Sequence, residues 1–226
     1  MTTAAVSSGV ERAALWRALS LGFAPPREET LAEVEALSEA LVEQAGLSEV
    51  EDVLAAIGST SFERHASEYQ RLFGGAVLVA PYEGSYELDP VRQGRELADV
   101  AAFYRAFGAE AHGPLAERPD HVGCELEFLS FLELRSLAAV EEGDEDGAEL
   151  VERIAASFLC DHAGRWLPAF FAAVREAEPE APVFRALAAL GSRVVAEELE
   201  RRGLEPRPLP RRHVRLAVER DSFDCG

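Results

Sequence analysis

Apolar residues recur every three or four positions along most of the chain, a spacing typical of amphipathic α-helices with one buried face. Glycines, prolines and acidic clusters separate the helical blocks. We expect helices over residues 10–21, 31–42, 50–57, 62–73, 97–107, 120–140, 150–174 and 184–199. No convincing sheet pattern accompanies them. The sequence therefore predicts an all-α fold, a single compact domain of about eight helices packed around Leu, Val and Phe side chains.

Polar residues in front of these blocks predict where several helices begin. In a capping box, a Ser or Thr side chain and a Glu three residues later satisfy two free backbone amides. Such boxes are expected from Thr30 to Glu33, from Ser48 to Glu51 and from Thr60 to Glu63. Asp120 is a favourable N-cap for the long helix that ends near Val140.

Other segments lack the helical period. Residues 74–94 carry Gly, Pro and Tyr, and residues 109–119 form a polar loop. Glu141 to Gly147 is an acidic, glycine-containing hinge through which two copies could exchange helices, so we expect a monomer or a domain-swapped dimer. Beyond Gly203, prolines at 206, 208 and 210 block a helix. We expect a helical domain over 1–203 and an extended C-terminal tail over 204–226.

Composition narrows the classes of partner. No apolar run approaches the roughly 20 residues of a membrane span. No basic region precedes an apolar block at the N-terminus, as it would in a secretory signal. We therefore expect a cytoplasmic protein. The formal net charge is −19, and the basic residues are all arginine. Such a surface repels nucleic acids and anionic membranes, and it attracts a basic partner.

Signatures of catalysis and of bound cofactors are missing. The chain has no glycine-rich phosphate loop, no dinucleotide fingerprint, no nucleophile elbow and no zinc-protease motif. Cys124, Cys160 and Cys225 lack metal-ligand spacing. We therefore expect no enzyme activity, no catalytic residue, no metal and no cofactor. One alternative stays open, a helical metal-binding enzyme. Its ligands would be His121 and Glu125 on one helix and the pair Asp161-His162 on another.

Three segments between residues 68 and 125 form a candidate recognition site. A helix ends with Glu68, Tyr69, Leu72 and Phe73, an aromatic loop runs from Pro81 to Tyr86, and Asp120-His121 opens the next long helix. Tyrosine rings combine apolar area with a hydroxyl group, which suits peptide binding. Carboxylates pair well with the planar guanidinium of arginine. We expect the helix end to be packed, and the loop and Asp120-His121 to be exposed.

These residues resemble the TorD/DmsD/NarJ family of redox-enzyme maturation chaperones. The resemblance rests on Tyr-x-x-Leu-Phe at 69–73, on Pro-Tyr-Glu-x-x-Tyr at 81–86 and on Asp-His-x-x-x-Glu-Leu-x-Phe-Leu from 120. The stretch 158–171, with Asp161-His162, Trp166 and Pro168, is also similar, and the resemblance covers roughly residues 10–200. The length and the tail over 222–225 look more like the branch that serves type II DMSO-reductase-family enzymes. Arg64 stands where the family often has a further Glu.

The resemblance implies an all-α fold and a non-catalytic function. Members bind the twin-arginine signal peptide and the apo-form of a molybdopterin oxidoreductase catalytic subunit in the cytoplasm. They assist cofactor insertion and delay export until maturation. Carried over by position, the signal-peptide-binding residues are Pro81, Tyr82, Glu83, Tyr86, Asp120, His121 and Glu125. The supporting residues are Glu68, Tyr69, Leu72 and Phe73.

Overall fold

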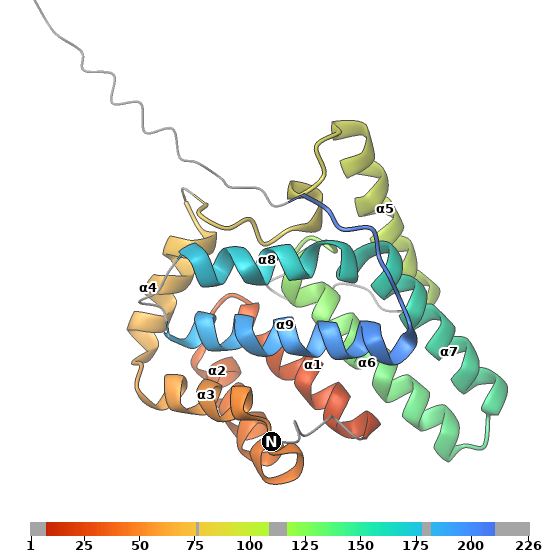
Figure 1. The fold of residues 1–226 in the computed structure, drawn as a ribbon, viewed down its shortest axis with the longest axis horizontal. Helices are drawn as coiled ribbons and strands as arrows, with labels where there is room; N and C mark the ends of the chain where they lie inside the picture. The colour runs from red at the N-terminus through yellow and green to blue at the C-terminus, as the bar shows by residue number, and fades with distance from the viewer. Residues whose placement is uncertain (1–7, 76, 109–116, 178–181, 211–226) are drawn as a thin grey trace, which may run out of the picture.

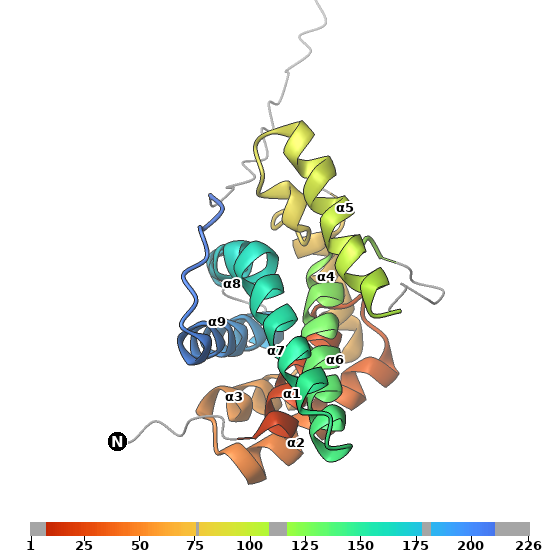
Figure 2. The same ribbon diagram turned by 90° about the vertical axis from the view of Figure 1, so that its right-hand side faces the viewer.

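The apolar stripes meet around two long helices, α1 (Gly9–Phe23) and α6 (Val122–Glu141), which pack against each other at the centre (Figures 1 and 2). A computed structural model describes residues 8–75, 77–108, 117–177 and 182–210. The other helices are α2 (Glu28–Ala45), α3 (Ser48–Gly58), α4 (Phe62–Phe73), α5 (Pro90–Ala106), α7 (Glu145–Phe158), α8 (Gly164–Ala177) and α9 (Pro182–Arg202). Within these described ranges no strand forms, which confirms the all-α prediction.

Pairs of neighbouring helices, together with the distant pair α3 and α9, complete the core. α9 runs alongside α8 and also contacts α3, while α2 packs on α1 and α7 packs on α6 (Figure 1). Phe23, at the end of α1, lies 5.2 Å from Phe170 and 5.7 Å from Phe171 between ring centroids. Phe184 of α9 joins this group at 6.3 Å from Phe23. Aromatic rings from three helices therefore hold the ends of the bundle together.

A π-helical turn, Leu159–Ala163, joins α7 to α8 into one continuous helical run. Counted in this way, the described chain has the eight helices that the sequence predicts. Pro168 lies inside α8 and cannot donate a backbone hydrogen bond to the preceding turn. The π turn is wider than an α turn, and it brings His162 into the buried interior.

The three predicted capping boxes are wrong in register. α2 begins at Glu28, so Thr30 lies in its first turn and exchanges hydrogen bonds with Arg27. α3 begins at Ser48 itself, because the buried Leu47 occupies the cap position. α4 is capped by Ser61, which accepts from the Arg64 amide.

The neighbouring Thr60 hydroxyl instead donates to the carbonyl of Ala56 in the preceding helix. A capping box does form at the start of α1, where Ser8 and Glu11 bond each other's backbone amides.

The first residues of the expected tail lie against the body. After α9, residues 204–210 carry no regular secondary structure, and Leu209 is buried. Its amide donates to the Arg165 carbonyl at 2.8 Å, next to the π turn. The predicted tail beyond residue 210, with Cys225 and the stretch 222–225, lies outside the described residues. Between α6 and α7 the expected hinge is a short turn at Gly143, which has a φ of 73°.

Candidate functional site

Backbone hydrogen bonds hold the aromatic loop against the start of α6. The Glu83 amide donates to the Asp120 carbonyl, and the Val122 amide donates to the Pro81 carbonyl, both at 2.9 Å. These bonds form an isolated antiparallel bridge between Tyr82 and His121. Two of the three segments that the sequence nominates are therefore direct neighbours in space. A short 3₁₀ turn, Glu83–Ser85, then carries the loop toward α5.

His121, and not Asp120, caps α6, which corrects the sequence prediction. The His121 Nδ1 atom accepts from the Gly123 amide at 3.1 Å. Burial lowers the pKa of His121, although Glu117 and Asp120 oppose this shift, so the ring is held in its neutral form. The Asp120 carboxylate instead accepts from the Gly84 amide of the aromatic loop and from the nearby Arg118 guanidinium.

Four residues, Tyr82, Glu117, Arg118 and Asp120, form what we call the outer site. Arg118 donates to Asp120 through Nε at 3.0 Å and through Nη2 at 2.8 Å, a bidentate pair. The same guanidinium lies over the Tyr82 ring, with its central carbon 4.9 Å from the ring centroid. The Tyr82 hydroxyl donates to Glu117 at 3.1 Å. An acidic and aromatic surface that holds a guanidinium is thus present in the protein.

Beneath the outer site lies a buried group that we call the inner site, namely Glu83, Glu125, His162 and Trp166. The Glu83 carboxylate lies 3.1 Å from His162 Nδ1, which links the loop to the π turn. Burial raises the pKa of Glu83. Burial lowers the pKa of His162, but the hydrogen bond and charge of Glu83, with a contribution from Asp99, outweigh it and give a net rise. The contact with Glu83 therefore favours a protonated imidazole on His162, while burial opposes the charge on Glu83.

Glu125 occupies the deepest position of the inner site. Its side chain is fully buried, and Oε2 accepts from the Trp166 indole at 2.8 Å. Oε1 has no hydrogen-bond partner in the structure. Burial raises the pKa of Glu125 well above its ordinary value, and the nearby Glu83 carboxylate adds to the rise. Burial therefore favours the neutral form of the Glu125 carboxyl group.

Burial contradicts the prediction that the loop and Asp120-His121 are exposed. Of the seven residues expected to bind the signal peptide, only Tyr82 is partly accessible. The other six are buried, namely Pro81, Glu83, Tyr86, Asp120, His121 and Glu125. Tyr86 packs on the Trp166 ring, and its hydroxyl donates to the Ala80 carbonyl. The sequence could not reveal this, because α5 and the π turn cover the loop from distant positions in the chain. The accessible part of the site is Tyr82 with Glu117 and Arg118.

The predicted supporting residues on α4 are packed as expected. Tyr69, Leu72 and Phe73 are buried, and the Tyr69 and Phe73 rings lie 5.1 Å apart. Burial raises the pKa of Tyr69, and the charges of Glu117 and Tyr82 add to the shift, which indicates that Tyr69 lies near the outer site. Glu68 accepts from Arg64 at 3.0 Å, so the residue that departs from the family pattern pairs with the adjacent acid. Whether these residues support ligand binding stays a prediction.

Sequence reasoning missed two contributions to the site. Arg118 was not nominated, although it stands next to Pro119-Asp120 and its side chain completes the outer site. His162 entered the sequence analysis as a possible metal ligand and Trp166 as part of the family resemblance. In the structure, His162 is the partner of Glu83 and Trp166 is the partner of Glu125. The repeated Asp-His pair at 161–162 was the signal that could have placed this segment at the site.

The geometry does not assemble the alternative metal site. Across the described ranges no group of three or more His, Cys, Asp or Glu side chains could hold a metal ion. His121 is committed to the Gly123 amide, Glu125 to Trp166 and His162 to Glu83. Asp161 is exposed on the π turn.

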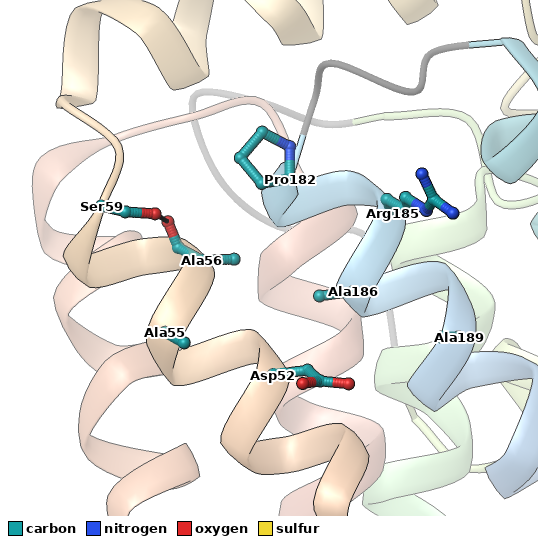
Figure 3. Close-up of a pocket in the computed structure, with 8 residues that line it drawn as sticks. All are labelled: Asp52, Ala55, Ala56, Ser59, Pro182, Arg185, Ala186 and Ala189. Carbon is teal, nitrogen blue, oxygen red and sulfur yellow. Dashed lines mark hydrogen bonds between the residues drawn. The ribbon is translucent and has the colours of Figure 1, made fainter.

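A separate shallow groove lies between α3 and α9, with a volume of about 470 Å³ (Figure 3). Small side chains line it from both helices, and Asp52 and Arg185 stand at its edges. None of the nominated residues belongs to this groove. It is therefore distinct from the outer site.

The all-helical fold has a counterpart among solved structures. The crystal structure of a protein from Archaeoglobus fulgidus, assigned as a redox enzyme maturation protein, matches with a TM-score of 0.55 and 20% sequence identity. The match covers 85% of this chain and 96% of that one. At this identity the likeness concerns the all-helical fold.

Sequence comparison then gives the family. The family described as nitrate reductase delta subunit matches residues 27–172, and the chain belongs to this family. The selenate reductase assembly chaperone of Thauera selenatis is 40% identical over 107 residues, which cover 46% of this chain and 54% of the relative. The chlorate reductase assembly chaperone of Ideonella dechloratans is 36% identical over 118 residues, which cover 51% of this chain and 58% of the relative.

The chain thus spans a little over half the length of these curated relatives. The matched region of the family includes α4, the aromatic loop, the start of α6 and the π turn. The resemblance to the TorD/DmsD/NarJ type of maturation protein is confirmed. In the described part of the chain, no helix is both long and apolar enough to cross a membrane.

Proposed function

We propose that this protein is a cytoplasmic, non-catalytic chaperone that binds the twin-arginine signal peptide and the apo-form of a molybdopterin oxidoreductase subunit. Binding would assist cofactor insertion and assembly and would delay export until maturation is complete. The two curated relatives are assembly chaperones of selenate and chlorate reductases, which supports a client of the same enzyme class. The protein would act as a monomer or as a domain-swapped dimer.

The observation that carries this proposal is the outer site. A buried carboxylate, an aromatic face and a second acid hold a guanidinium in a bidentate and stacked arrangement. Arginine is distinguished from lysine by this planar geometry. A peptide with conserved arginines is therefore the kind of ligand that the site fits.

Charge supports the same partner. The chain carries a formal charge of −19, and a basic signal peptide would be drawn to it over several ångströms before contact. A cytoplasmic location follows for a protein that acts before its client is exported.

The test is maturation of a client in cells. The client is the molybdopterin oxidoreductase subunit encoded nearest to this chain's gene, and the readout is its molybdenum content per polypeptide. We expect that content to fall strongly without the chaperone and to fall in part with Tyr82→Ala. The control is Leu150→Ala, which removes an exposed apolar side chain from α7. Equal molybdenum content with and without the chaperone would refute the proposal.

Tyr82→Ala is preferable to a double alanine change at Asp120 and His121. His121 caps α6, and loss of a cap costs about 1 kcal/mol. Asp120 is buried and pairs with Arg118, so its removal would take away the ion-pair partner of Arg118. A change in binding could then reflect a disturbed helix start and not a lost contact.

A further inference from the structure

Arg118 occupies the outer site in a manner unusual for a surface arginine. Its side chain is 54% exposed, yet both ends of its guanidinium fork reach a carboxylate that is 0% exposed. The ring of Tyr82 forms one wall, at 4.9 Å from the guanidinium carbon. The cation is thus held by a buried anion, although its own side chain is about half exposed.

Gly84 of the aromatic loop lies beside the carboxylate and the guanidinium. Its amide donates to Asp120 Oδ2 at 3.2 Å. A Cβ atom at this position would lie 3.1 Å from that oxygen and 3.6 Å from Arg118 Nη2. We call this arrangement the seat of the guanidinium; it consists of the Asp120 carboxylate at the start of α6 and of the Tyr82 ring and Gly84 backbone in the aromatic loop.

We infer that Arg118 is an internal stand-in for a ligand arginine, and that a bound peptide places its own guanidinium on Asp120 by displacing Arg118. This inference rests on the proposed function. The geometry requires the displacement, because Asp120 is inaccessible while Arg118 covers it. The exchange replaces one guanidinium with another, so the buried carboxylate is never left without a cation.

The exchange has a cost for affinity. Only the fraction of molecules in which Arg118 has left the seat can bind, and the apparent dissociation constant is the intrinsic one divided by that fraction. Lysine is a poor substitute because it lacks the fork and the planar face. Arg118 would thus exclude ligands that cannot match its own contacts with Asp120 and Tyr82.

The first test is chemical rescue of Arg118→Ala, with the melting temperature as the readout. Removal of the guanidinium leaves Asp120 without its cation, so the variant should melt below the wild type. Millimolar ethylguanidinium should raise its melting temperature toward the wild-type value, whereas ethylammonium at the same concentration should not. Wild type and Arg118→Ala with Asp120→Asn are the controls, and neither should respond. An equal response in all three proteins would overturn the inference.

The second test separates this inference from the proposed function. The client's signal peptide is titrated into wild type and into Arg118→Ala, after circular dichroism has confirmed equal helix content. We expect binding about tenfold tighter in the variant if Arg118 fills the seat roughly nine-tenths of the time. Equal or weaker binding by the variant would show that Arg118 does not compete. Absence of binding by both proteins would contradict the proposed function, and the rescue result would then decide on the seat alone.

Discussion

His65 lies on the buried face of α4, with its ring stacked on Phe184 at 4.6 Å between centroids. Its Nδ1 atom has no hydrogen-bond partner in the structure. Burial lowers the pKa of His65 to about 4, so the folded protein holds a neutral imidazole. An unfolded chain takes up that proton near pH 6.5. Acid therefore favours unfolding through this residue.

We predict that His65→Phe makes the protein less sensitive to acid. Because the folded pKa is depressed, the wild type loses stability as the pH falls from about 6.5 to about 4, by up to about 3 kcal/mol from this group. The variant keeps the stacked ring and lacks the titrating group. Urea unfolding of both proteins across this pH range measures the difference. Parallel stability curves would contradict the prediction.

For Glu125 we predict the opposite pH dependence, a loss of stability as the pH rises. Its folded pKa lies well above the unfolded one because of burial, so the wild type loses stability as the pH rises above about 4.5 toward that raised pKa. Glu125→Gln keeps an acceptor for Trp166 and does not titrate. The variant should match or exceed the wild type at neutral pH, and the gap should close near pH 4. A variant that is much less stable at neutral pH would show that Glu125 is ionised.

Single residues mark the limit of prediction from sequence. The segments around Tyr82 and Asp120 were recognisable from their motifs, and the structure brings them together. Asp120 is a good cap by local preference, yet its carboxylate bonds the distant Gly84 amide and the neighbouring Arg118 in place of the helix amides. The predicted exposure of the aromatic loop was wrong, because burial of the loop depends on segments up to about 80 residues away in sequence.

At the scale of elements, one contact ties the aromatic loop to the α7–α8 run. Glu83 is 0% exposed and reaches His162 across 79 residues of sequence. His162 also lies 3.3 Å from Asp99 of α5. The π turn, the loop and α5 therefore share one polar junction beneath the outer site.

We predict that Glu83→Ala loosens this junction. Removing one partner of a buried ion pair costs roughly 3–5 kcal/mol, because the other is left without compensation. Hydrogen exchange should then speed up at the amides of Glu83 and Val122, which the loop bonds protect. Glu87→Ala is the matched control, since the Glu87 carboxylate accepts from the amides of Leu88 and Asp89, which follow it in the chain. Equal effects of the two changes would show that the link to His162 contributes little.

Helix existence followed from periodicity, but helix boundaries did not. The glycine stop at Gly46 was predicted correctly and has a left-handed conformation with a φ of 59°. Starts were often displaced, by two residues at α3, where burial of Leu47 draws Ser48 into the helix, and by seven at α5, which begins at Pro90. The single helical run over α7 and α8 was predicted, but the π turn within it was not, because a π turn has no distinct sequence pattern.

On the scale of the whole molecule, the sequence predicted the fold class but not the arrangement of helices. Periodicity identifies a buried face and does not identify its partner, so the pairings of α1 with α6 and of α3 with α9 came only from the structure. The resemblance to maturation chaperones supplied what periodicity could not. The boundary at 203 between the domain and the tail stays a prediction.

The acidic surface makes a prediction about salt. With a net charge of −19, attraction of a basic peptide should be strong at low ionic strength and screened as salt is added. We expect the association rate of the signal peptide to fall steeply with salt, and the dissociation rate to change little. Stopped-flow fluorescence with a labelled peptide measures both rates. An association rate that does not depend on salt would remove the role assigned to the surface charge.

Isothermal titration with the client's signal peptide tests the central claim most directly. Micromolar wild-type protein at low salt is titrated with the natural peptide and, in parallel, with a peptide whose two arginines are replaced by lysines. Our account predicts saturable heat for the natural peptide and markedly weaker binding for the lysine peptide, because Asp120 and Tyr82 recognise a planar guanidinium. No heat with the natural peptide, or equal binding of both peptides, would contradict it.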